Sequence, residues 1–375
     1  MTTRLASLAW RIQVKTILAL LAALSTALPG NAAENQFSRL PRTNLLVFHG
    51  KHGKILPVGS KSDWLKRRAE IVSGFESIAG PLPGREKRCE LNVRIEETKD
   101  CGNYERRLIT YQSEPGSRVP AYLLIPKSAL GGKQKFPAVL ALHPTASQFG
   151  HRVTVETVTE NYRAYARDLV ELGLVVLAPS YPLLANYQPD IKALGYKSGT
   201  MKAIWDNKRG LDLLDTLPFV KHGNYGALGH SLGGHNAIYT AVFDERIKVI
   251  VSSCGFDSFL DYYNGDPKNW QLERGWCQTR YMPRLAEFQG QLAEIPFDFH
   301  ELIGALAPRV LFVNAPLGDG NFKHHSVDEI LSAAAPVYRL YKSERNVQVM
   351  HPDCGHDFPP EAREQAYRLL EEKLR

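Results

Sequence analysis

The stretch of sequence that decides the fold is residues 224–237, which read NYGALGHSLGGHNA. A short, mostly apolar run enters a G-x-S-x-G pentapeptide centred on Ser231, and small and apolar residues follow it. That order predicts a strand, a sharp turn and the start of a helix. Gly229 and Gly233 stand two residues to either side of the serine, where a Cβ would collide with the crossing strand and helix. The pattern therefore predicts a nucleophilic serine exposed on a strained turn at the end of a strand.

The charge of the chain gives no support for nucleic-acid binding. The formal net charge of the 375 residues is +7, and three of the cations, Arg4, Arg11 and Lys15, lie in the first 32 residues, where there is no Asp or Glu. The remaining positive charge is spread along the chain without a dominant cluster. The sequence contains no basic stripe and no recognisable nucleic-acid reader motif.

The first 32 residues have the pattern of a secretory signal peptide. The basic opening is followed by an apolar run over residues 16–28 and by the small residues Ala32 and Ala33, after either of which cleavage is expected. The apolar run is too short to span a bilayer of about 30 Å, and no later segment is long and apolar enough to do so. The sequence therefore predicts a secreted or periplasmic protein without a membrane span after cleavage.

Export makes disulfides possible for the five cysteines, which are Cys89, Cys101, Cys254, Cys277 and Cys354. The odd number leaves at least one of them unpaired within the chain. A strand between Cys89 and Cys101 would hold that pair apart, so Cys254 and Cys277 are the geometrically easier pair. No C-x-x-C or His/Cys spacing suggests a metal, and no cofactor is expected.

The first part of the chain has its own pattern. Residues 33–90 are expected to form an N-terminal arm and a helix, and residues 91–375 a catalytic domain. The arm shows no clear period over residues 34–61, and capping and apolar spacing predict a helix over residues 64–79. Three extended segments follow, and the short turns between them imply antiparallel pairing. These segments are residues 91–97, 104–112 and 119–125.

After two glycines at 131 and 132, strand-like and helical segments alternate, which is the pattern of a mostly parallel sheet covered on both faces. The expected strands are residues 136–143, 174–179, 225–230, 247–253, 309–314 and 347–351. The expected helices are residues 158–173, 201–217, 232–242, 326–341 and 360–375. Counted from Tyr104, the sheet has eight strands, and Ser231 follows the fifth.

An insertion at about residues 257–300 breaks this alternation and is rich in Phe, Tyr and Trp. In an α/β sheet it would lie over the carboxyl ends of the strands, where ligands bind. We interpret it as a cap, with Trp276 and Tyr281 as substrate-binding residues. The alternative is an insertion that serves packing and has no ligand contact.

A nucleophilic serine needs a base within hydrogen-bond reach and a third group that orients the base. Among twelve histidines, His356 is the predicted base, because it follows Gly355 in the loop after the last strand. His351, at the end of that strand, is the main alternative. His230 and His235 are too close to the serine in sequence to turn back to its hydroxyl.

The orienting acid is expected between the serine and the base in sequence, on a loop after a strand. Asp319 satisfies this condition, since it lies between two glycines just after an apolar run. Asp328 and Glu329 are alternatives, but both have the position of first-turn acids that favour a helix dipole. Asp357 is too close to His356 in sequence to orient it well.

Two backbone N–H groups are expected to form an oxyanion hole. One belongs to Leu232, which follows the nucleophile, and the other to the loop after the third strand. That loop reads HPTAS from His143, and because Pro144 has no N–H, Thr145 is the first candidate donor. His143 is a candidate substrate-binding residue or shapes the pocket by hydrogen bonding.

Residues 104–375 resemble the α/β-hydrolase fold enzymes, in the dienelactone-hydrolase, acetylxylan-esterase and prolyl-oligopeptidase-like branch. The resemblance is carried, in family order, by His143 to Thr145, Gly229 to Gly233, Gly318 to Gly320, and Gly355 with His356. It implies an α/β-hydrolase fold with an N-terminal helical extension and a cap. Dienelactone hydrolases proper carry a cysteine where this chain has Ser231, and prolyl oligopeptidases carry a propeller for which this chain has no room.

The resemblance implies a secreted serine esterase acting on small-molecule or polysaccharide esters, with short acyl or carbohydrate-linked esters as the expected substrates. The first alternative is a secreted peptidase or amidase, because the same triad cleaves amides. The second is a non-catalytic binding protein with a relict site, although every chemical position is filled.

Overall fold

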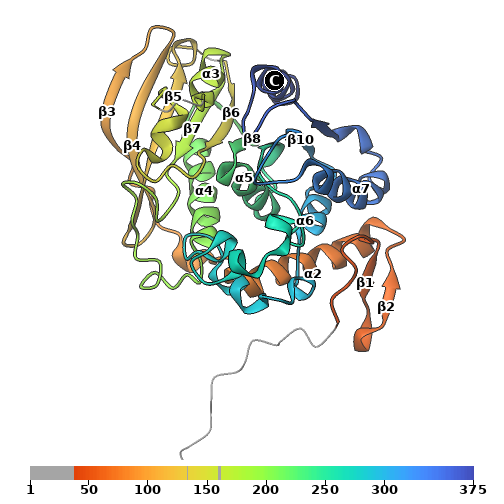
Figure 1. The fold of residues 1–375 in the computed structure, drawn as a ribbon. Coiled ribbons are helices and arrows are strands. Elements are labelled where there is room, and N and C mark those ends of the chain that lie inside the picture. Colours follow the sequence, from red (N-terminus) through yellow and green to blue (C-terminus); the bar gives the residue numbers. More distant parts are fainter. Residues whose placement is uncertain (1–37, 133, 159–161) are drawn as a thin grey trace, which may run out of the picture. The chain divides into compact units, whose positions relative to one another are not determined.

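A nine-stranded sheet is the centre of the structure, a computed structural model that describes residues 38–132, 134–158 and 162–375 (Figure 1). Its strands are β3 (Arg94–Asp100), β4 (Tyr104–Glu114), β5 (Ser117–Pro126), β6 (Phe136–Leu142), β7 (Val175–Pro179), β8 (Val220–His230), β9 (Ile247–Ser253), β10 (Val310–Asn314) and β11 (Val347–Met350). Their order is β11-β10-β9-β8-β6-β7-β5-β4-β3. Strands β11 to β7 in that order are parallel, and β5, β4 and β3 are antiparallel. The predicted α/β-hydrolase fold is confirmed.

The expected number of eight strands is wrong, because a ninth strand lies at the edge of the sheet. The segment expected at residues 91–97 forms β3 at Arg94–Asp100 and pairs antiparallel with β4. All seven of its residues are exposed, and their sequence, RIEETKD, is mostly charged. Charged side chains on an edge strand hinder pairing with other chains, and they also weaken the apolar signal by which a strand is found.

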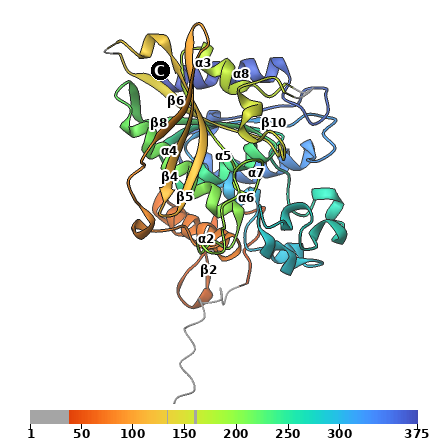
Figure 2. The same cartoon turned by 90° about the vertical axis from the view of Figure 1, so that its left-hand side faces the viewer.

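Helices cover both faces of the sheet (Figure 2). They are α2 (Lys61–Ala79), α3 (Tyr165–Glu171), α4 (Gly199–Thr216), α5 (Leu232–Phe243), α6 (Phe299–Leu306), α7 (His324–Leu340) and α8 (Pro360–Leu374). Helices α3 and α8 share one buried cluster with the sheet, and α2, α4, α5, α6 and α7 share the other. Neighbouring residues of one strand, such as Val139 and Leu140, enter opposite clusters, as strand geometry requires.

Two other segments differ from the prediction. The helix expected over residues 158–173 is shorter, since α3 begins only at Tyr165 and the chain before it is irregular where it is described. The arm expected to be irregular over residues 34–61 contains a short antiparallel hairpin of β1 (Val47–His49) and β2 (Ile55–Pro57). The predicted signal peptide, residues 1–32, lies outside the described residues.

The N-terminal arm and α2 hold the base of the cap. Arg42 donates a hydrogen bond to Asp298 at 2.7 Å, and Arg39 forms an ion pair with Glu301 at 2.8 Å. Asp298 and Glu301 together form the capping box of α6. A Cβ at Gly74 of α2 would lie 2.8 Å from the Pro296 carbonyl oxygen, so the helix and the cap are in close backbone contact.

The cap consists of short 3-10 turns between residue 257 and α6, and part of its aromatic content serves packing. The turns are η5 (Tyr262–Gly265), η6 (Pro267–Trp270), η7 (Gly275–Cys277), η8 (Pro283–Phe288) and η9 (Leu292–Glu294). Phe259, Trp270 and Phe297 are fully buried, and the Phe259 ring packs edge-on against the other two. Within the described residues, no helix is long and apolar enough to cross a membrane.

Cys254 and Cys277, the geometrically easier pair, form no disulfide, and all five cysteines are free thiols. The Cys254 thiol contacts the Asp357 carbonyl oxygen at 3.2 Å, whereas Cys277 is buried in the apolar cluster that includes the cap. The two side chains therefore lie in different environments. Although the predicted topology places the two segments near each other, their sulfur atoms are not bonded.

Candidate active site

Ser231 lies in a strained turn between β8 and α5. Its backbone has φ 55° and ψ −121°, a conformation that is rare for any residue other than glycine. The flanking glycines are required by close packing, since a Cβ at Gly229 would lie 2.2 Å from the carbonyl carbon of Gly233. A Cβ at Gly233 would lie 1.9 Å from the carbonyl oxygen of Leu142. The turn has the backbone geometry that the pentapeptide predicts for a nucleophile elbow.

The turn lies at the point where the strand order reverses. After β6 the chain runs to β7 on one side of it and then to β8 on its other side. The carboxyl ends of β6 and β8 are therefore neighbours, and the loop that contains Thr145 lies beside the loop that contains Ser231. Ligands bind in such crevices of open α/β sheets.

Two backbone N–H groups are available beside the serine. Leu232 is the first residue of α5, so its N–H has no acceptor within the helix. In the part of the chain that the structure describes, the N–H of Thr145 also has no protein acceptor. Both residues line a cavity together with Ser231. This placement is compatible with the predicted oxyanion role, which stays a prediction.

His143 is buried and holds the loop, which corrects its expected contact with substrate. Its Nδ1–H donates to the Pro144 carbonyl oxygen at 2.7 Å, and its Nε2 accepts a hydrogen bond from the Tyr181 N–H at 2.8 Å. Burial lowers the pKa of His143 to about 4, so the ring is neutral. With both ring nitrogens occupied and only 2% of its surface exposed, His143 shapes the site by hydrogen bonding.

His356 and Asp319 are hydrogen-bonded to each other at the carboxyl edge of the sheet. The His356 Nδ1 lies 2.9 and 3.0 Å from the two carboxylate oxygens of Asp319. The carboxylate also accepts hydrogen bonds from the N–H groups of Asn321 and Phe322, at 2.8 and 3.2 Å. Burial raises the pKa of Asp319, but the hydrogen bond and charge of His356 and the two N–H groups outweigh it, and the net pKa is lowered. The carboxylate is therefore ionised beside the imidazole.

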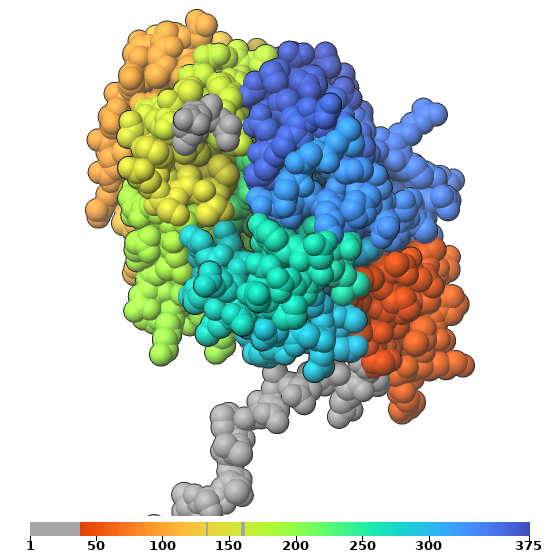
Figure 3. Space-filling view, viewed as in Figure 1, coloured from red at the N-terminus to blue at the C-terminus, as the bar shows by residue number. Residues whose placement is uncertain are grey.

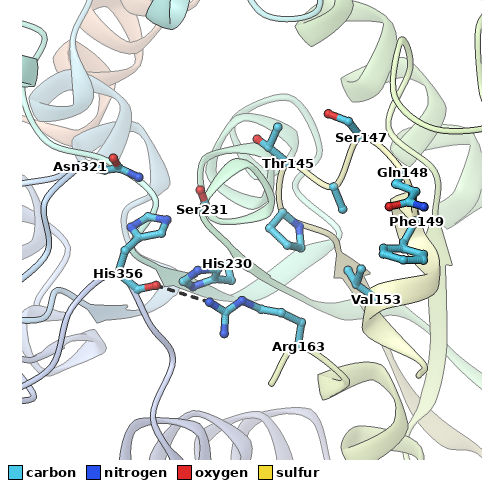
Figure 4. Close-up of a pocket in the computed structure, with 12 residues that line it drawn as sticks. Thr145, Ser147, Gln148, Phe149, Val153, Arg163, His230, Ser231, Asn321 and His356 are labelled. Carbon is cyan, nitrogen blue, oxygen red and sulfur yellow. Dashed lines mark hydrogen bonds between the residues drawn. The ribbon is translucent and has the colours of Figure 1, made fainter. Parts of the chain in front are cut away.

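Arg163, which the sequence did not single out, supports the His356 loop from below (Figure 4). Its guanidinium donates to the Asp357 carboxylate at 2.6 Å and to the His356 carbonyl oxygen at 3.4 Å. The side chain of Arg163 is 8% exposed. No local pattern marks Arg163, because it lies in a segment expected to be helical and its partners are almost 200 residues away. Asp357 is thus paired with Arg163 and does not orient His356.

The rival residues have other partners. His351 contacts Asp328 at 3.1 Å, so these two alternatives are partners of each other. His230 is buried and its Nδ1 contacts the Ser253 hydroxyl at 3.0 Å. Glu329 is exposed on α7. None of the four contacts the Asp319 carboxylate, to which His356 is hydrogen-bonded.

Ser231 and His356 line one open cleft of about 760 Å³. Figure 3 shows a hollow between the yellow-green segment near residue 150, the teal cap and the blue C-terminal loops, and Figure 4 shows the His356 ring beside the serine. In the described part of the chain, no hydrogen bond joins the Ser231 hydroxyl to His356. Such contacts are often long in ligand-free enzymes and tighten in the substrate complex.

A second cavity of about 250 Å³ extends from Ser231 beneath the cap. Its aromatic walls are Tyr262, Tyr263, Trp276, Tyr281 and Phe322. The expected substrate-binding residues Trp276 and Tyr281 therefore lie in this cavity. Tyr281 also joins the cap to the oxyanion loop, because its hydroxyl lies 2.8 Å from the Thr145 hydroxyl.

Three buried polar atoms of residues that line the second cavity have no hydrogen-bond partner: His235 Nε2, Trp276 Nε1 and Arg280 Nε. His235 Nδ1 faces the Gly255 carbonyl oxygen at 3.0 Å and must carry the proton, so its Nε2 is an acceptor. Trp276 Nε1 and Arg280 Nε are donors. Unpaired buried polar atoms are costly, and these three belong to residues that line one cavity.

The fold, the strained serine and the neighbouring His–Asp pair define a serine hydrolase of the α/β-hydrolase fold. The predicted resemblance to the serine esterases of this fold is confirmed by comparison with known proteins. A family model described as "Glucuronyl esterase, fungi" matches residues 190–341. That segment contains Ser231, the cap and Asp319, and His356 lies beyond it.

The chain is also similar to several individual proteins. A protein of Bacillus subtilis (strain 168) named "Putative hydrolase YtaP" is 26% identical over 317 residues, which cover 82% of this chain and all of that protein. A glucuronoyl esterase from Solibacter usitatus has a TM-score of 0.70 at 20% identity, covering 91% of this chain and all of that one. A carbohydrate esterase family 15 glucuronoyl esterase from Caldicellulosiruptor kristjansonii has a TM-score of 0.65 at 18% identity, covering 90% and 91%.

The Asp319–His356 hydrogen bond leads to the first testable prediction. In Asp319→Asn the carboxylate is replaced by a neutral group of the same shape, so the imidazole loses the partner that fixes its tautomer. We expect kcat to fall by about 10⁴, the size of the effect in a serine protease, with little change in Tm. The matched control is Glu329→Gln, an exposed acid of α7, which should keep its kcat. A kcat of Asp319→Asn within tenfold of the wild type would exclude Asp319 as the orienting acid.

Proposed function

We propose that the protein is a carboxylic ester hydrolase that cleaves carbohydrate-linked esters through an acyl-enzyme. The single observation that supports this most is the shared cleft, in which Ser231 on its strained turn faces the His356–Asp319 pair. The esterase names of the similar proteins point to the same chemistry. The pattern of two neighbouring N–H groups beside the serine is that of an acyl-transfer site.

In this mechanism Ser231 Oγ attacks the ester carbonyl carbon while His356 Nε2 takes its proton. The negative charge that develops on the carbonyl oxygen is stabilised by the N–H groups of Leu232 and Thr145. His356 returns the proton to the leaving alcohol, and the acyl group stays on the serine. Water then attacks the acyl-enzyme with His356 as base, and the carboxylic acid is released. Asp319 holds the imidazole in the tautomer with the proton on Nδ1 throughout.

The second cavity supports a sugar as part of the substrate. Its walls combine aromatic rings with residues that carry two unpaired donors and one unpaired acceptor. These three atoms are buried, so a sugar hydroxyl would pair with them after a side-chain rotation. Its volume of about 250 Å³ and its polar lining suit a sugar ring better than a long acyl chain. The family model that spans the cap and the serine describes an esterase of a sugar acid. We therefore take esters of uronic acids as the first substrates to test.

A panel of substrates tests the reaction and the substrate class together. We expect benzyl glucuronate to be hydrolysed with a higher kcat/KM than acetylated xylose. Among acyl esters, we expect 4-nitrophenyl acetate to be hydrolysed with a higher kcat/KM than the 4-nitrophenyl ester of decanoic acid.

Ser231→Ala should lower each activity by several orders of magnitude, since the oxyanion hole alone retains about 10³–10⁴ over water. A higher kcat/KM on peptide anilides than on every ester would establish the amidase alternative. Inertness of the folded wild type towards a fluorophosphonate would establish the relict site.

The role of the second cavity has its own test, in which two tryptophans are compared. Trp276→Phe removes the unpaired donor of the cavity and keeps most of the ring, so we expect kcat/KM for benzyl glucuronate to fall about tenfold relative to 4-nitrophenyl acetate. Trp270→Phe is the matched control, since its Nε1 is also unpaired but the ring is buried in the packing of the cap. An equal effect of both substitutions on the ratio would show that cap packing, and not sugar recognition, is responsible.

We also propose that the chain is exported, on the basis of the signal-peptide pattern of residues 1–32. The expected result is a mature protein that begins at Ala33 or Glu34 when the full chain is expressed in a bacterial host. Intact-mass analysis of the periplasmic and medium fractions measures this directly. A full-length species confined to the cytoplasm would contradict the proposal.

A further inference from the structure

Three side chains that the proposed mechanism does not use come together, and none of them lines either cavity at Ser231. His324 and Asp328 are one turn apart on α7, and His351 directly follows β11. One ligand atom from each lies within 4.8 Å of the other two. The His324 and His351 rings are 5.4 Å apart between centroids. The fold thus gathers two imidazoles and one carboxylate from parts of the sequence that are more than twenty residues apart.

The hydrogen bonds of His351 indicate that a cation belongs in this cluster. Its Nδ1 lies 2.7 Å from the Ala315 carbonyl oxygen, which can only accept, so Nδ1 carries a proton. The other nitrogen, Nε2, lies 3.1 Å from the Asp328 carboxylate, which also accepts. In a neutral imidazole Nε2 would present a lone pair to an anionic oxygen. A positive charge, either a second proton or a metal ion, is needed to make this contact favourable.

The presence of His324 favours the metal ion over the proton. A second imidazole next to a protonated His351 adds no stabilisation to an ion pair, but it supplies a second nitrogen ligand. Metal-ligating histidines usually donate the remaining ring N–H to a backbone carbonyl, as His351 does to Ala315. Metal–ligand distances of about 2.0–2.2 Å need only small side-chain rotations from separations below 4.8 Å.

We propose that His324, Asp328 and His351 bind one divalent transition-metal ion, of the class that prefers imidazole with carboxylate, such as Zn²⁺ or Ni²⁺. All three side chains reach the solvent at least in part, so water can complete the coordination. The ion joins the start of α7 to the end of β11.

The position of this site gives the ion a structural role near the proposed catalytic residues. The segments after β10 and β11, which carry Asp319 and His356, are joined by backbone hydrogen bonds from Leu317 to Pro352 and from Gly318 to Cys354, both at 3.0 Å. His351 lies at the start of this paired region and is bonded to Ala315 within it. A bound ion would hold the start of this paired region, and its three ligands lie outside the lining of both cavities at Ser231.

Metal binding is tested on the full mature chain, purified without a histidine tag and treated with EDTA. We expect equilibrium dialysis at micromolar Ni²⁺ or Zn²⁺ to give one ion per chain, and Tm to rise by a few degrees, because a ligand that binds only the folded state stabilises it. His351→Ala, His324→Ala and Asp328→Asn should each weaken binding at least tenfold and abolish the rise in Tm. The matched control is His325→Ala, an exposed neighbour on the same helix, which should bind as the wild type does.

The free thiols require a further readout, since Cys254 lies close to Asp319 and His356 and could bind the same ions. Co²⁺ bound by His324, Asp328 and His351 should show d–d absorption without a thiolate-to-cobalt charge-transfer band. The proposal is overturned if less than one ion binds per chain, if that charge-transfer band accompanies binding, or if His325→Ala weakens binding as much as His351→Ala does. Circular dichroism of every variant separates loss of the site from loss of the fold.

Discussion

The contact between the start of α5 and the end of β6 determines the geometry of the site. At Gly233 a Cβ would lie 1.9 Å from the Leu142 carbonyl oxygen, so the helix begins as close to the strand as a backbone without a side chain allows. To enter the helix there, the chain must turn sharply, and Ser231 adopts a positive φ. The same contact brings the N–H of Leu232 near the loop of Thr145, since both loops line one cavity. One close approach thus places the serine and both predicted oxyanion donors.

The parts of the fold that the sequence predicted well are those encoded locally. The pentapeptide specifies the turn at Ser231, and the apolar runs specify most of the strands of the parallel part of the sheet. Asp319 and His356 could be singled out because each follows a strand in a glycine-containing loop, and strands of a parallel sheet end at the same edge. The structure joins their side chains by a hydrogen bond at 2.9 Å, and their catalytic roles stay predictions.

The sequence missed Arg163 and left open the place of β3 in the sheet and the role of His143. Arg163 supports the His356 loop through Asp357, 194 residues away, and nothing near Arg163 in the chain marks that role. The extended segment that forms β3 is predicted, but not as a ninth strand of the sheet, because a charged and exposed edge strand lacks the pattern of a buried one. His143 has the position of a site residue, but both of its nitrogens are occupied by backbone groups. Composition and spacing do not show whether the hydrogen-bonding atoms of a side chain are already paired.

The cap shows most clearly why residue type alone does not define a binding surface. Trp270 and Trp276 are both almost completely buried, and both have an unpaired Nε1, yet one belongs to the interior packing and the other to the wall of a cavity beside Ser231. An unpaired donor inside an apolar cluster only costs stability, whereas one beside a cavity can regain a partner when a ligand binds. His235 and Arg280 repeat the second situation around the same cavity. The proposal of a polar substrate therefore depends on which residues line this cavity, and not on the aromatic content of the cap by itself.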